Sequence, residues 1–227
     1  MKRIGIAVLS AASLLAAGTA AAAEPQWNYG QIGWIQSDGP EDAGEGDGFK
    51  LDGSIGFLDN FHFQISYEDG TYDGGGSYFG GDDTDWDGYR TSLGYHQAIN
   101  SNGNTQVIFN INYFDIDFED DGGEGFGDGT ADGYGLGFGL RSMISDKVEL
   151  EGMINWTKGS YDPDYSYFSD EDYTDTTLSV GGRYHWLQNV STGLTLTLNA
   201  GDQTDSFGGG DSALFDLRYS FGSDISK

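Results

Sequence analysis

Polar and apolar residues alternate with a period of two along many short stretches of this chain. The clearest case is the stretch 132–159. Before a short turn at 145–147, every second residue is apolar; these residues are Tyr134, Leu136, Phe138 and Leu140. After the turn the alternation resumes, with Glu149 and Glu151 on the opposite parity to Ile154 and Trp156. Period-two alternation on both sides of a short turn predicts a β-hairpin.

The same alternation predicts ten strands. They cover residues 27–37, 48–57, 61–67, 88–98, 105–114, 133–143, 148–158, 176–186, 190–200 and 212–221. Most are close to the roughly 9–11 residues that a tilted strand needs to cross a membrane. The first strand is the least regular, because Trp27, Tyr29 and Ile35 compete with Ile32 and Trp34 for the apolar parity.

The connections between these strands alternate between two kinds. Short ones lie near 58–60, 99–104, 144–147 and 187–189, and long ones at 38–47, 68–87, 115–132, 159–175 and 201–211. Short periplasmic turns and long extracellular loops are the layout of an outer-membrane barrel. We therefore predict an all-β chain that forms a transmembrane antiparallel up-and-down β-barrel of about ten strands, with eight strands as the alternative.

Charge changes this picture by its placement. The chain has a net charge of −27, and 29 of its 37 acidic residues fall in the five long connections. Lys158, at a strand edge, is the nearest base. A soluble β-sandwich or lipocalin-like barrel would leave this segregation unexplained. Nucleic acid is excluded as a partner, since binding it requires clustered Lys and Arg.

The amino-terminal segment has the features of a secretory signal peptide. Lys2 and Arg3 precede an apolar run over 4–17, and the small residues 21–23 end an Ala-x-Ala cleavage site. We expect cleavage before Glu24, which leaves 24–227 as a single barrel domain. The chain has no cysteine. Its stability must therefore come from elsewhere, and a closed ring of backbone hydrogen bonds is one source.

Aromatic residues occupy both ends of the outward parity. The periplasmic set is Trp27, Phe57, Phe61, Tyr95, Trp186 and Tyr219. The outer set is Phe49, Tyr67, Tyr89, Tyr113, Tyr134 and Trp156. Two such girdles are expected where amphipathic rings meet lipid headgroups.

Several short segments resemble a known family. They are Gly48-Phe49 with Gly53-Ser54, Gly139-Leu140-Arg141 with Glu149-Leu150, Gly181-Gly182-Arg183-Tyr184, and Leu217-Arg218-Tyr219-Ser220-Phe221. As a whole the pattern resembles the small outer-membrane β-barrel proteins of Gram-negative bacteria, of the porin-like or OmpA-barrel-like type.

The resemblance implies a bacterial outer-membrane location, with outer-membrane lipid and lipopolysaccharide as partners. It also implies a barrel-assembly machinery that reads an aromatic residue ending the last strand. Here Phe221 is followed by residues 222–227. These families include pores, structural barrels and a few enzymes, so the fold does not decide the function.

Ionisable residues on the inward parity are the candidate site. We predict an ionic layer in the lumen, made of Arg90, Arg141, Glu149, Glu151, Arg183, Asp216 and Arg218. Most of these residues lie close to short turns or to the carboxyl end, and buried charges need partners. The layer is either a salt-bridged plug or a charged constriction that selects solutes.

The sequence also bears on catalysis and on cation binding. His62, His96 and His185 fall on the inward parity near the periplasmic end, and we find no nucleophile–base constellation, so we predict no enzyme activity. Asp115, Asp117, Asp120 and Asp121 cluster in a predicted loop. Clustered carboxylates suit Ca²⁺, although the spacing is not that of an EF-hand; a solvated acidic surface is the alternative.

These observations favour one function and leave a second open. The first is a structural barrel or a narrow, cation-favouring passive channel that passes small ions. The second is a cell-surface binding or adhesion module, in which acidic and aromatic loops act with divalent cations. No cofactor is expected beyond a loosely bound Ca²⁺.

Overall fold

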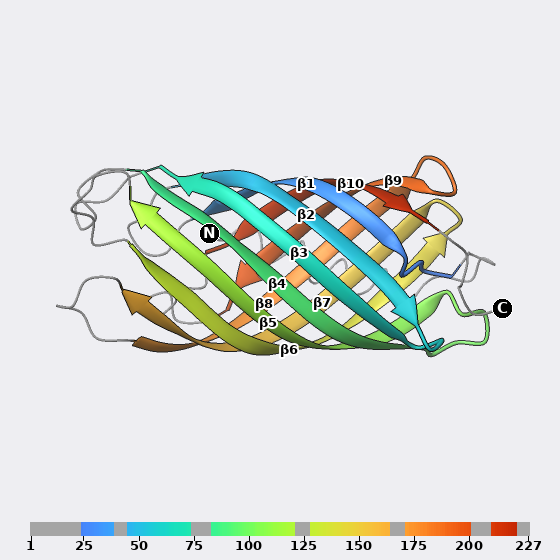
Figure 1. Cartoon of the computed structure of the whole chain (residues 1–227). Coiled ribbons are helices and arrows are strands. Elements are labelled where there is room, and N and C mark those ends of the chain that lie inside the picture. The colour runs from blue at the N-terminus through green and yellow to red at the C-terminus, as the bar shows by residue number, and fades with distance from the viewer. Residues whose placement is uncertain are drawn as a thin grey trace.

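The computed structural model describes residues 24–38, 45–73, 83–120, 128–163, 171–200 and 210–221. They form ten β-strands (Figure 1). The strands are β1 (Tyr29–Asp38), β2 (Glu45–Phe57), β3 (Phe61–Tyr72), β4 (Thr84–Ala98), β5 (Thr105–Asp120), β6 (Gly129–Ser145), β7 (Val148–Pro163), β8 (Glu171–His185), β9 (Val190–Asn199) and β10 (Ser212–Ser220). The predicted signal peptide, 1–23, lies outside the described residues.

The strands close into one antiparallel barrel in which each strand pairs with its neighbours in sequence. The ring is completed by β1 and β10, whose register runs from Tyr29 opposite Ser220 to Ser37 opposite Ser212. Closure pairs the backbone of both terminal strands and leaves no open sheet edge. The structure confirms the predicted ten-stranded all-β barrel and not the eight-stranded alternative. The described part of the chain contains no helix that is long and apolar enough to cross a membrane.

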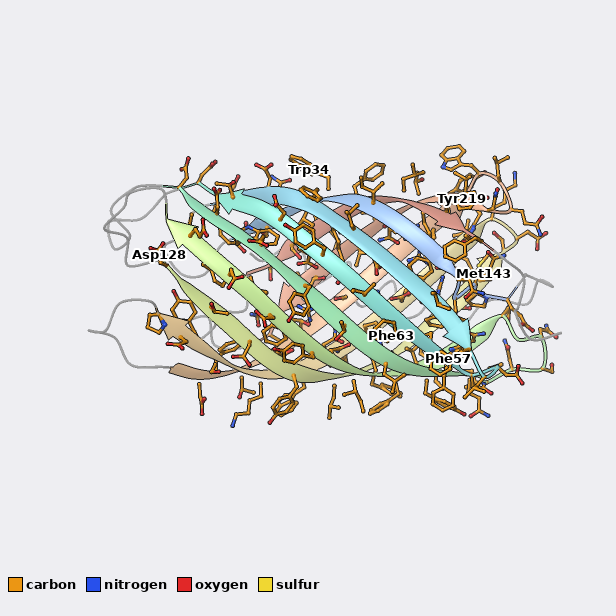
Figure 2. All side chains as sticks on the ribbon, viewed as in Figure 1. Trp34, Phe57, Phe63, Asp128, Met143 and Tyr219 are labelled. Atoms are coloured by element: carbon orange, nitrogen blue, oxygen red, sulfur yellow. The ribbon has the colours of Figure 1, made fainter. Side chains whose placement is uncertain are left out.

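An apolar belt surrounds the outside of the barrel. Trp34 and Phe63 lie in it, and their side chains project from the outer wall (Figure 2). Except for Trp27, the predicted girdle residues lie on this outward face, and most are exposed. Polar residues take the inward parity, as expected when a lumen is polar and an exterior meets lipid. We call the two ends of the barrel the short-turn end and the long-loop end.

The strands extend further toward the long-loop end than the sequence predicts. Residues 68–72, 84–87, 115–120, 129–132, 159–163 and 171–175 belong to strands and were wrongly assigned to loops. Beyond the apolar belt the period of two persists but its polarity reverses: Asp115 and Asp117 face outward, while Phe118 packs inward. The backbone ladder does not require an apolar exterior, so it continues into this acidic region. Pro163 ends β7, where its missing N–H interrupts no central ladder.

The inward cluster at the long-loop end is apolar. Ile35, Tyr72 and Trp86 are buried against one another, with Phe118 and Leu214 packed beside them. The rings of Tyr72 and Trp86 are tilted against each other by 31°, with their centroids 5.9 Å apart. This cluster therefore fills part of the lumen at the long-loop end, beyond the polar section of the lumen.

Inward glycines make room for large side chains of neighbouring strands. The β-carbon that Gly94 lacks would lie 2.1 Å from the ring of His62, on the adjacent strand. The one that Gly70 lacks would lie 2.8 Å from Trp86. A glycine in a strand often marks such a close approach, and here it lets the side chains pack inside a narrow barrel.

Replacing one of these glycines should destabilise the barrel. We expect Gly94→Ala to cost about 1–3 kcal/mol, because the new methyl group overlaps the buried His62 ring. The matched control is Gly30→Ala, since the added β-carbon would have no neighbour within 4 Å. The free energy of urea unfolding in lipid vesicles measures both. Equal stabilities of the two variants would contradict this account of the inward glycines.

Candidate functional site

Glu149 is the centre of a network of charges inside the short-turn end. Its carboxylate accepts a hydrogen bond from Arg141 Nη2, with N···O distances of 2.9 and 3.0 Å. Arg183 Nε and Arg218 Nη1 lie 3.8 and 3.7 Å from the same carboxylate. His185 Nε2 lies 3.6 Å from Glu149 Oε2. One buried acid therefore interacts with three arginines that come from three different strands.

A second ion pair extends the network along the inner surface of the barrel, from β8 to β10. Arg183 Nη2 donates a hydrogen bond to Asp216 Oδ2 at 2.9 Å, and Arg183 Nη1 lies 2.7 Å from Asp216 Oδ1. The two residues lie on β8 and β10 and meet over Gly193 of β9. A β-carbon at position 193 would lie 2.6 Å from Asp216 Oδ2 and 2.8 Å from Arg183 Nη2. This glycine therefore permits the pair, and a hydrogen bond between two charged groups is stronger than one between neutral groups.

Neutral side chains accept hydrogen bonds from further arginine donors, whereas Arg141 Nε and Arg218 Nη1 have only ion-pair contacts among the described residues. Gln31 Oε1 accepts from Arg218 Nε at 2.8 Å and from Arg183 Nη2 at 3.2 Å. The Arg218 guanidinium also lies over the ring of Tyr29, 3.8 Å from its centroid. Such cation–π contacts are strongest where both partners are removed from water.

The layer is buried and electrically balanced. Arg141 and Glu149 are each 2% exposed and Asp216 is 1% exposed. Glu151, 3.7 Å from Arg141 Nε, is the one partly exposed acid of the layer. Three arginines therefore face three carboxylates. A buried layer of this kind persists only because each charge has a partner close by.

Two sequence-based assignments to this region are wrong. Arg90 does not join the layer: it lies opposite Ser66 and Phe114, and its guanidinium stacks 5.4 Å above the Phe114 ring. The alternation along the strand correctly predicts that Arg90 faces the lumen, but it does not specify the position of Arg90 along the barrel axis. Trp27 is not in the outward girdle, because it precedes β1 and turns into the lumen.

Trp27 covers the short-turn side of the ionic layer. Its ring stacks on His62 and His96, with centroid distances of 4.1 and 4.4 Å. The indole N–H donates to Gln106 Oε1 at 2.8 Å, and the Arg141 guanidinium lies 4.8 Å from the ring centroid. The segment before the first strand thus supplies an aromatic cap to the arginine layer.

A cavity of about 400 Å³ lies in the lumen beside the layer. Lys50 and Glu68, an ion pair, line it together with Arg90, Tyr173 and Asp175. The sequence analysis missed Glu68, Tyr173 and Asp175, because all three fall in stretches that it assigned to loops. The alternation of exposed Asp172 and Thr174 with buried Tyr173 and Asp175 is the signal that could have found the last two.

The histidines and the predicted cation ligands lie apart. His62 Nδ1 is 3.3 Å from His96 Nδ1, whereas His185 contacts Glu149. Within the described ranges, no group of three or more His, Cys, Asp or Glu side chains could hold a metal ion.

Of the predicted cation ligands, Asp115 and Asp117 lie on the outward face of β5. Asp115 accepts hydrogen bonds from the hydroxyls of Tyr89 and Tyr113, both at 3.2 Å, and Asp117 accepts one from Thr130 at 2.9 Å. Asp120 is the last residue of β5, and Asp121 lies outside the described residues. The Ca²⁺ site stays a prediction.

Removing the central carboxylate should weaken the fold. Glu149→Gln keeps the side-chain shape but leaves three arginines facing two carboxylates, so we expect a loss of about 3–5 kcal/mol. Glu151→Gln is the matched control, because the Glu151 side chain is 41% exposed and has one long contact; its loss should be about 1 kcal/mol or less. Urea unfolding in vesicles measures both. A Glu149 variant as stable as the Glu151 variant would show that the network does not hold the layer together.

Comparison with known proteins gives a fold and no close relative. No protein-family model matches the chain, and no curated protein is similar to it in sequence. Among solved structures, the β domain of the Bordetella autotransporter BrkA has a TM-score of 0.55 at 10% identity, covering 87% of this chain and 100% of that one.

Two further solved structures are less similar in shape. The transport unit of AIDA-I from Escherichia coli has a TM-score of 0.46 at 12% identity, with coverage of 94% and 97%. The KdgM porin in complex with disordered oligogalacturonate has a TM-score of 0.44 at 13% identity, and the match covers 86% of this chain and 99% of the porin. The closed ten-stranded barrel, its apolar belt and its polar lumen agree with the BrkA likeness. The chain therefore has the fold of the outer-membrane β-barrel proteins.

Proposed function

We propose that this protein is a structural barrel of the bacterial outer membrane, closed to solutes at its short-turn, periplasmic end. The observation that carries the proposal is the burial of Arg141, Glu149 and Asp216, each 2% exposed or less, inside the short-turn end of the lumen. Side chains as shielded from water as these favour a packed, closed lumen at this level. Trp27 adds an aromatic cap on the same side.

Two physical features support closure over passive transport. A ten-stranded barrel has a narrow interior that side chains can largely fill. The ionic layer is also neutral, so it offers no fixed charge to attract ions of one sign. A narrow cation-favouring channel would have to move the layer aside first, with the acidic long-loop end then supplying the preference for cations. The proposal includes no catalytic step.

Conductance separates the closed barrel from the channel. In planar bilayers we expect no current steps from the wild type, and small steps from the double variant Trp27→Ala/Arg141→Ala, in which two large lumen groups are removed. Trp34→Ala, on the outward face, is the matched control and should stay silent. Far-UV circular dichroism verifies that each variant is folded. Cation-selective steps from the wild type would replace the structural role with the channel.

A second candidate function is supported by the outer surface of the long-loop end. Tyr67 donates to Asp69 and Asp87, at 3.2 and 3.4 Å, and the Asp115 pairs described above lie beside them in the sheet. Carboxylates thus follow the aromatic girdle, where lipopolysaccharide headgroups would lie. We propose that divalent cations bridge these acids to lipid phosphates or to an extracellular partner, because direct contact would be repulsive.

Calorimetric titration with Ca²⁺ tests this second function. We expect heat at millimolar Ca²⁺ for the wild type and clearly less for Asp115→Asn/Asp117→Asn. Asp146→Asn, in the exposed turn at the opposite end, is the control and should bind as the wild type does. Absence of heat from the wild type up to about 10 mM would remove the cation-dependent surface, because a Kd weaker than about 10 mM corresponds to less than about 2.7 kcal/mol of binding free energy.

A further inference from the structure

One acid in the lumen cavity lacks any partner. Asp175 is 3% exposed, lines the cavity, and has no hydrogen-bond donor to either carboxylate oxygen among the described residues. Buried carboxylates are ordinarily hydrogen-bonded or paired, since an isolated buried charge is costly. Asp175 therefore calls for a cationic partner, and none of the described residues places one within hydrogen-bond reach.

One base in the same cavity is also left over. Lys50 is paired with Glu68, and the arginines of the ionic layer have their carboxylates. Arg90 lines the cavity, and no described carboxylate lies within ion-pair distance of its guanidinium. Its guanidinium carbon lies over the ring of Phe114, 5.4 Å from the centroid, and none of its N–H groups donates to a described residue.

The two unpaired groups act on the same part of the cavity. Tyr173, 4% exposed, lines the same cavity as Asp175 and Arg90. Gly159, opposite Tyr173 on β7, leaves the space that this ring occupies, because a β-carbon there would lie 2.7 Å from the Tyr173 hydroxyl. Yet Arg90 and Asp175 make no ion pair with each other. The gap between them is thus bounded by one negative and one positive group.

We propose that this cavity binds a small zwitterion that carries an ammonium and a carboxylate group, such as a free amino acid. Its ammonium pairs with Asp175 and its carboxylate with Arg90. A plain amine would pair with Asp175 alone, and a plain carboxylate would pair with Arg90 alone. The volume of about 400 Å³ is in the range of small-molecule sites. Binding requires no passage through the barrel, so this inference goes beyond the proposed function.

Calorimetry on the folded protein in detergent tests the proposal with ligands of graded length. The zwitterions are glycine, 4-aminobutyrate and 6-aminohexanoate, which separate the two charges progressively. Butylamine and butyrate carry one charge each and serve as matched controls. At least one zwitterion should bind about tenfold more tightly than either single-charge compound, which corresponds to about 1.4 kcal/mol.

Variants locate the site. Asp175→Asn and Arg90→Gln should each weaken the preferred zwitterion about tenfold or more. Lys158→Gln, on the outward face of β7, should leave the affinity within about twofold. Circular dichroism verifies folding. If either site variant fails to fold, the wild-type ligand series decides.

Four results would overturn the proposal. Butylamine binding as tightly as the best zwitterion would indicate a site for cations alone, and butyrate doing so would indicate a site for anions alone. No heat from any zwitterion at millimolar concentration would show that the cavity takes none of them. Folded site variants that bind as the wild type does would place the zwitterion elsewhere.

Discussion

The pairing of β1 with β10 is the constraint on which the rest of this structure depends. Because the ladder closes, each residue of a strand faces either the outside or the lumen, and no edge remains. The outside becomes a continuous apolar belt. The lumen becomes narrow, with space that must be filled from ten strands at once. Charged residues that are distant in sequence, such as Glu149 and Arg218, are thereby brought within 3.7 Å of each other.

Filling the lumen relies on charge balance and on glycine together. Each arginine of the ionic layer has a carboxylate, and a layer with one partner removed would cost several kcal/mol. Gly193 and Gly94 have no side chain, so Arg183 and Asp216 occupy the space beside Gly193, and His62 occupies the space beside Gly94. The result is a packed short-turn end and a cavity further along the lumen. In that cavity Arg90 and Asp175 stay unpaired, which contrasts with the balance of the layer.

The sequence was sufficient for much of the fold because the two faces of a strand meet different surroundings. Ten strands, their inward and outward parities, and the inward acids and bases all followed from alternation. The strand ends at the long-loop side did not. There the outward residues are Asp115 and Asp117 instead of apolar ones, so a rule that equates apolar with outward stops too early. Asp175 and Glu68 were missed for the same reason.

By itself, then, the sequence determined which side chains face the lumen, since that depends on a local period of two. Only the tertiary structure decided which of them meet. The height of a residue in the barrel depends on strand tilt and on the register of every neighbour, and this information is not local. Arg90 therefore separates from the other arginines, and Trp27, which no strand parity governs, turns inward onto His62 and His96. The ionic layer is a property of the closed ring and of no single hairpin.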